Sequence, residues 1–88
     1  MKKIKTPKIS EILREEYMIP LHLSAYRLAK DIGVSSSHIS NILHDKTRIN
    51  AETSIRLGRY FGVNDKYFLA IQSDIDIRKA RLAYERIN

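Results

Sequence analysis

Four short polar side chains lie on one side of a predicted helix at residues 35–43, and their types suit hydrogen bonding. A serine hydroxyl can bond several bases and therefore selects weakly among them. The amide of Asn41 offers a donor and an acceptor that match the edge of adenine. No arginine on this helix is placed to contact guanine, so we expect modest direct readout, with DNA shape and dimer spacing supplying the rest. The predicted base-contacting residues are Ser36, Ser37, Ser40 and Asn41.

A second set of polar residues, on both sides of this helix, is suited to the phosphate backbone. Hydroxyls, cations and helix N-termini bond phosphate oxygens without carrying sequence information. Tyr26 and Arg27 belong to the start of the preceding helix, where a solvated polar face is the alternative explanation. The predicted backbone-contacting residues are Tyr26, Arg27, Ser35, Lys46, Thr47 and Arg48.

No arrangement typical of an enzyme or a metal site occurs in this sequence. His22, His38 and His44 fall in different predicted elements or six residues apart on one helix, which is poor spacing for a shared metal ion. Ser37 and His38 are adjacent, so their side chains point apart on a helix and cannot act as a nucleophile and its base. Cysteine is absent, and so is a glycine-rich phosphate loop. We therefore expect no catalytic residue, metal, cofactor or small-molecule substrate.

Two short helices joined by a tight turn, within residues 24–44, are expected to position the polar side chains. Ser24 and Ser35 are the predicted N-caps, because serine hydroxyls accept hydrogen bonds from the first free amides of a helix. Ala29 is small, which allows the second helix to cross closely. Gly33 can adopt the positive φ that ends the first helix. This pattern of residues is typical of a helix-turn-helix, whose second helix enters the major groove of DNA.

An amphipathic helix is predicted before this motif, at residues 9–19, with Ser10 as its N-cap. Pro20 is expected to end the helix, and the connector should return Leu21 and Leu23 to the core. A solvated surface explains the acidic face most simply, and a basic partner is the alternative. The apolar face consists of Ile9, Ile12, Leu13 and Tyr17, and the acidic face of Glu11, Glu15 and Glu16.

After the motif, Asn50 is predicted to cap a helix at residues 51–61, which ends at Gly62. Thr53 or Arg56 should face phosphate or solvent. The expected buried positions of this helix are Ile55, Leu57 or Gly58, and Phe61.

The last segment, about residues 64–88, carries a broken apolar stripe along one or two helices. Phe68 and Ile71 are expected to close the core. The remaining apolar residues exceed what a small domain needs and predict a homodimer interface, while a helix that folds back on its own domain is the alternative. The predicted dimerisation residues are Ile75, Ile77, Leu82 and Tyr84.

The 88-residue chain carries a net charge of +6, but the charge is unevenly placed. Four lysines lie within residues 1–8, so residues 9–88 have a net charge of only +2 (12 basic minus 10 acidic). Residues 1–8 predict a flexible basic arm that contacts DNA, binds a partner or is simply solvated, and residues 9–88 a single domain. No apolar run approaches the roughly 20 residues of a membrane span, so we expect a cytoplasmic protein without membrane association.

The stretch LSAYRLAKDIGVSSSHISNILHDKTRINAETSIRLGRYFGVNDKYFLAIQSDIDIRKA, with EILREEY before it, resembles the HigA-type (VapI-like) antitoxins. These belong to the lambda-repressor-like, XRE-type helix-turn-helix proteins. The resemblance implies an all-α, five-helix DNA-binding domain with a C-terminal helical extension. It also implies a dimer that represses its own operon and neutralises a HigB-type mRNA endonuclease toxin. By the same resemblance, Ser36, Ser37 and Asn41 meet bases, and Lys46 and Arg48 meet phosphates.

Three features of the sequence depart from the family pattern. Ile9-Ser10 stands where Pro-Gly is common, and Phe68 stands where tryptophan is usual. Asp45 stands where glycine is frequent, so a different cap is expected after the second motif helix. None of these positions is a predicted DNA contact. Two other functions stay open: a stand-alone or phage-type repressor without a toxin, and a protein-interaction module whose DNA surface has decayed.

Overall fold

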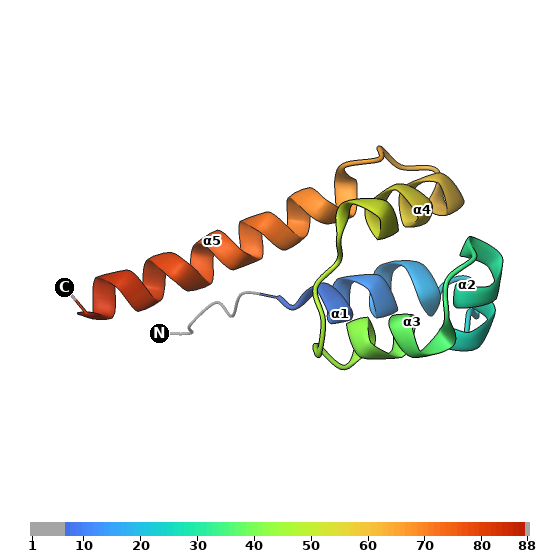
Figure 1. Cartoon of the computed structure of the whole chain (residues 1–88), viewed down its shortest axis with the longest axis horizontal. Helices are drawn as coiled ribbons and strands as arrows, with labels where there is room; N and C mark the ends of the chain where they lie inside the picture. Colours follow the sequence, from blue (N-terminus) through green and yellow to red (C-terminus); the bar gives the residue numbers. More distant parts are fainter. Residues whose placement is uncertain (1–6, 88) are drawn as a thin grey trace.

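The computed structural model describes residues 7–87, and the regular structure in that range is entirely helical. α1 continues directly into the π-helical segment η1, so the described chain forms five helical rods (Figure 1). The predicted all-α, five-helix fold class is confirmed. Of the predicted arm at 1–8, residues 1–6 lie outside the described residues. The elements are α1 (Ile9–Ile12), η1 (Leu13–Met18), α2 (Ala25–Ile32), α3 (Ser36–Leu43), α4 (Ala51–Phe61) and α5 (Tyr67–Ile87).

The first helix has its N-cap at Lys8, two residues before the predicted cap at Ser10, and then widens. The amide of Lys8 donates to Glu11 Oε1 at 3.0 Å, and Ser10 is buried, so the prediction of Ser10 as N-cap is wrong. Leu13 and Met18 are both buried although they are five residues apart. Five residues correspond to about 140° around an α-helix, so the wider π-helical turn is what brings both side chains to the core.

The connector after the first helix returns only one of its two leucines to the core. Leu23 packs against the buried cluster, whereas Leu21 is exposed, so the prediction for Leu21 is wrong. His22 has a φ of 55°, and its amide donates to the Ile19 carbonyl at 3.0 Å. This tight reversal points Leu21 outward.

The two motif helices, α2 and α3, have the predicted caps. Ser24 Oγ accepts from the Arg27 amide and Ser35 Oγ from the His38 amide, both at 3.1 Å. Ala29 is buried between the helices, and Gly33 has a φ of 78°. The predicted helix, left-handed turn and second helix are therefore confirmed.

The end of α3 differs from what the aspartate predicts. Asp45 has a φ of 57°, its amide donates to the Ile42 carbonyl at 3.1 Å, and the Lys46 amide donates to the Asn41 carbonyl at 2.8 Å. These are the hydrogen bonds of a left-handed helix cap that glycine usually provides. The expectation of a different cap geometry is wrong, since Asp45 adopts the glycine-like conformation itself.

α4 has its predicted bounds, but one side chain is placed differently. Asn50 Oδ1 accepts from the Thr53 amide at 2.8 Å, and Gly62 ends the helix with a φ of 76°. Leu57 is buried as predicted, whereas Ile55 is exposed. Thr53 is buried beneath α3, so of the two alternatives Thr53 or Arg56 only Arg56 reaches solvent, and the prediction of a buried Ile55 is wrong.

An aromatic cluster joins the first helix to α4 and α5. The ring centroid of Tyr17 lies 5.0 Å from that of Phe61 and 5.1 Å from that of Phe68. Phe68 is fully buried, so phenylalanine maintains the aromatic packing at this position. Burial, together with a hydrogen bond involving Tyr67, raises the pKa of Tyr17 to about 12. The Tyr17 hydroxyl is therefore protonated at neutral pH.

α5 is one helix of 21 residues with two different halves. Its first half packs on the domain, and Ile75 is 5% exposed. The prediction that Ile75 lies on a free dimer face is wrong, because this side chain belongs to the protomer's own core. All residues from 77 to 86 are exposed, and this half extends away from the other helices (Figure 1). The buried apolar core comprises Ile9, Leu13, Met18, Leu28, Ala29, Ile32, Ile39, Ile42, Leu43, Ile49, Leu57, Phe68 and Ile75.

Candidate nucleic-acid interface

α3 separates its apolar and polar side chains onto opposite sides. Ile39, Ile42 and Leu43 are buried against the core. The polar residues Ser36, Ser37 and Asn41 are exposed, and Ser40 is half-buried. The Asn41 amide makes no side-chain hydrogen bond with any described residue, so both its donor and its acceptor face outward unused. Ser40 is less available, because its hydroxyl lies 3.4 Å from His44 Nδ1.

Two contacts from outside the motif hold α3 in place. Arg14 Nη2 donates to the Leu43 carbonyl at 3.2 Å, at the C-terminal end of the helix. His38 Nε2 lies 2.9 Å from Thr53 Oγ1 and joins α3 to α4. A cation at a helix C-terminus is favourable because it satisfies free carbonyls and opposes the helix dipole. Periodicity alone cannot identify either contact, since each joins residues that are distant in sequence.

At the start of α2, one predicted contact is exposed and unengaged while the other is already paired. Tyr26 is exposed and makes no hydrogen bond or ion pair with another described residue. Arg27 Nε donates to Asp31 Oδ1 and Oδ2 at 3.1 and 3.0 Å. Asp31 also accepts from the Tyr60 hydroxyl at 2.7 Å. Sequence reasoning missed Asp31, although its spacing of four residues from Arg27 is a typical helix ion pair.

The hydrogen bonds of Asp31 shift the acidity of both partners. The Tyr60 hydroxyl, followed by the Arg27 guanidinium, holds the pKa of Asp31 below its ordinary value of 3.8. The Asp31 carboxylate in turn raises the pKa of Tyr60 above 10.0. Because these bonds favour charged Asp31 and neutral Tyr60, they link α2 to α4 over the whole neutral range.

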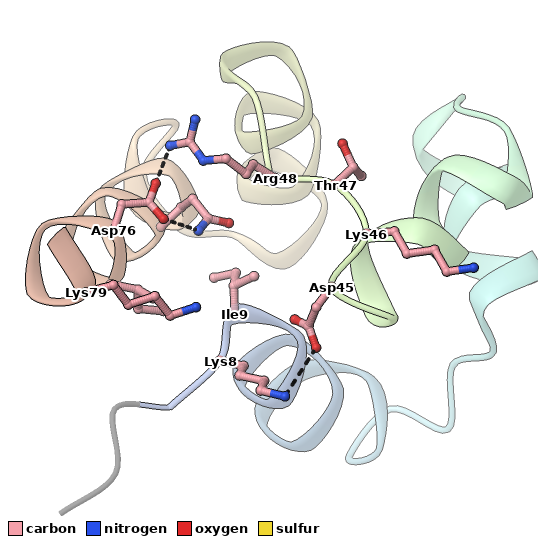
Figure 2. Close-up of a pocket in the computed structure, with 10 residues that line it drawn as sticks. Lys8, Ile9, Asp45, Lys46, Thr47, Arg48, Asp76 and Lys79 are labelled. Atoms are coloured by element: carbon pink, nitrogen blue, oxygen red, sulfur yellow. Dashed lines mark hydrogen bonds and ion pairs between the residues drawn. The ribbon is translucent and has the colours of Figure 1, made fainter. Parts of the chain in front are cut away.

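The loop after α3 carries the remaining predicted contacts and is tied to α5. Lys46, Thr47 and Arg48 are all exposed, and Arg48 forms an ion pair with Asp76 (Figure 2). The pair is flanked by Gln72, which donates to Asp76 Oδ1 at 3.2 Å and accepts from the Ile49 amide at 3.4 Å. Figure 2 shows Lys46 directed away from this group.

These contacts bring the loop residues and α5 together, while Tyr26 and Arg27 form a separate group. Within the described part of the chain, no hydrogen bond or ion pair joins Tyr26 or Arg27 to α3. Gln72 and Asp76 had no role in the sequence prediction. They are more than 20 residues from the loop, and no local pattern indicates their pairing.

Over residues 7–87, no three histidine, aspartate or glutamate side chains come together in a way that could hold a metal ion. No helix in that range combines the length and the apolar character needed to cross a membrane.

The capped helix pair with a polar outer face on α3 defines a helix-turn-helix domain. The chain belongs to the helix-turn-helix family, whose model matches residues 13–68. It is 44% identical over 78 residues to virulence-associated protein I of Dichelobacter nodosus, covering 89% of this chain and 72% of that protein. It is 28% identical over 87 residues to antitoxin HigA-1 of Vibrio cholerae, covering 97% and 82%.

A solved structure has the same fold over nearly the whole chain. This is Pseudomonas aeruginosa antitoxin HigA with the higBA promoter, with a TM-score of 0.87, 29% identity, and coverage of 93% of this chain and 89% of that one. The resemblance to HigA-type (VapI-like) antitoxins is confirmed.

The hydrogen bonds that Asp31 accepts from Arg27 and Tyr60 should make a pH-dependent contribution to stability. Tyr60→Phe should remove part of this contribution. A lowered pKa stabilises the fold above the ordinary pKa of 3.8 and loses that effect as pH falls through the folded-state value. A raised tyrosine pKa stabilises below 10.0 and loses its effect as pH rises through the folded-state value. In urea unfolding, Tyr60→Phe should therefore have a lower free energy of unfolding than the wild type at neutral pH. This difference should shrink at both pH extremes. NMR titration should show the Asp31 pKa moving up towards 3.8.

Tyr26→Phe is the matched control, because it removes an exposed hydroxyl that has no partner among the described residues. It should leave both the Asp31 titration and the neutral stability unchanged. An Asp31 pKa that does not move in Tyr60→Phe would contradict the assignment of Tyr60 as its main stabilising partner.

Proposed function

We propose that this chain is a DNA-binding antitoxin that represses its own operon as a homodimer and neutralises a HigB-type mRNA endonuclease. The main support is the outward face of α3, where the side chains of Asn41 and Ser36 have no hydrogen-bond partner among the described residues and the helix is held at both ends. The likeness to an antitoxin HigA that was solved with its promoter adds to this support. A stand-alone repressor without a toxin is the second candidate function.

In this proposal α3 lies in the major groove of the operator. Asn41 contacts adenine, and Ser36, Ser37 and Ser40 add weaker base contacts. Hydroxyls and cations at the start of α2 and in the loop after α3 contact phosphates and set the register of α3 without selecting bases. The backbone-contacting residues are Tyr26, Arg27, Ser35, Lys46, Thr47 and Arg48. The protein acts in the cytoplasm as a binding protein and has no catalytic role.

The exposed half of α5 is the proposed dimer interface. Ile77, Leu82 and Tyr84 are exposed large apolar residues in this half. Ile77 and Tyr84 are seven residues apart and share one face, whereas Leu82 lies about 140° around the helix from Ile77. Leu82 continues the face of the buried Ile75. A second copy must therefore contact both faces of α5 to bury all three side chains.

Asn41→Ala should weaken operator binding by about 1–3 kcal/mol per contacted half-site, because it removes one bidentate base contact. Binding isotherms on a duplex from upstream of the reading frame, and on a scrambled duplex of equal length, would measure this. The scrambled duplex should bind the variant and the wild type equally. Equal losses on both duplexes would contradict base contact by Asn41.

The dimer interface is tested by Ile77→Asp and Leu82→Asp in sedimentation velocity. A buried unpaired carboxylate is costly, so each variant should shift the chain towards monomer. Ser73→Asp adds the same charge at an exposed polar position of α5 and should leave the dimer intact. A dimer that persists in both apolar variants would exclude this surface.

The antitoxin function is tested by co-expression with the product of the adjacent reading frame. A tagged form of this chain should retain that product through purification and restore growth to cells that express it. If operator binding is present but no complex forms and growth is not restored, the stand-alone repressor is the correct function.

A further inference from the structure

A cleft of about 160 Å³ lies between the start of α1, the loop after α3 and α5. Figure 2 shows its lining, with Ile9 at the centre and charged side chains around it. The cleft adjoins Thr47 and Arg48, which are proposed backbone contacts. The residues that α5 contributes to this cleft are not among the proposed DNA contacts.

The charges of the lining favour an anion. Four cations and two carboxylates leave a net charge of +2. Both carboxylates are already paired, Asp45 with Lys8 at 3.9 Å and Asp76 with Arg48. Lys79 forms no ion pair with any described residue, and its amine points into the cleft (Figure 2). The excess positive charge inside the cleft is therefore concentrated at Lys79, since Lys46 points away.

The backbone of Lys79 is fixed relative to the loop. Ile75, one helical turn earlier, is buried in the core. Gln72, a further turn back, is also buried and accepts from the Ile49 amide. These contacts join α5 to the chain directly after Arg48. Lys79 and Arg48 are thus held on one rigid frame, and only their flexible ends must adjust to a ligand.

We propose that Lys79, together with Arg48, forms a binding site for a phosphodiester group of the DNA backbone. This inference rests on the proposed DNA-binding function and extends its backbone contact from the loop to α5. Phosphates repeat every 3.4 Å of helix axis along a strand, so a strand that touches the loop presents further phosphates nearby. A lysine ammonium suits such a site as a mobile point charge.

The test compares Lys79→Gln with Arg78→Gln in fluorescence anisotropy titrations on operator and scrambled duplexes over a series of salt concentrations. Arg78 is the matched control, because it is an exposed cation directly before Lys79 in α5 and does not line the cleft. One lost phosphate contact reduces the salt slope by about 0.9 and weakens binding about five-fold near 0.15 M salt. We expect this change on both duplexes for Lys79→Gln, retention of the slope in Lys79→Arg, and a smaller change in Arg78→Gln.

Two failures are distinguishable in this experiment. If the wild-type chain shows no salt-dependent binding to any duplex, the proposed DNA-binding function itself is wrong. If the wild type binds, but Lys79→Gln and Arg78→Gln have equal slopes, only the phosphate site at Lys79 is overturned. Arg48→Ala serves as a positive control for a lost backbone contact, and sedimentation of each variant confirms equal dimer content.

Discussion

The left-handed turn at Gly33 is the constraint on which the geometry of the helix pair depends. A Cβ atom at Gly33 would lie 3.0 Å from Arg56 Nη1, because the guanidinium from α4 closes over the turn. The same nitrogen donates to the Ile32 carbonyl at 2.7 Å. One arginine therefore satisfies the end of α2 and opposes its dipole, and its guanidinium would have to shift by a few tenths of an ångström to admit a Cβ atom where the chain turns towards α3.

α3 is held by the same means at its own C-terminal end, where Arg14 donates to the Leu43 carbonyl. Both motif helices thus have serine caps of their own at the N-terminus and an arginine from a flanking helix at the C-terminus. These contacts to the helix ends come from within the domain. None of them uses the side chain of Asn41 on the outer face of α3. The Asn41 amide is accordingly exposed and has no side-chain hydrogen bond to any described residue.

Features that depend on local backbone geometry could be predicted from the sequence, and features that depend on distant packing could not. The caps at Ser24, Ser35 and Asn50 involve residues three positions apart, so residue type and spacing identified them. Burial of Thr53 and Ile75 depends on which helices lie above them, and the apolar period of one helix does not contain that information. Met18 was missed because the π-helical turn changes the period itself.

The candidate site divides in the same way. The outward position of Asn41 follows from the spacing of Ile39, Ile42 and Leu43, and it was predicted correctly. The ion pair of Arg48 with Asp76 joins residues 28 positions apart, so neither residue signals the other.

The projecting half of α5 bears on the spacing between two DNA half-sites that a dimer could bind. Ten exposed residues, 77–86, extend for about 15 Å at 1.5 Å per residue. If two copies join through these segments, sliding one helix along the other by a turn moves the paired domains by about 5.4 Å, or between one and two base pairs. The pairing of the two α5 helices would then determine the distance between the DNA-binding domains. Substitutions of α5 residues that contact no nucleotide would change which half-site spacing the protein accepts.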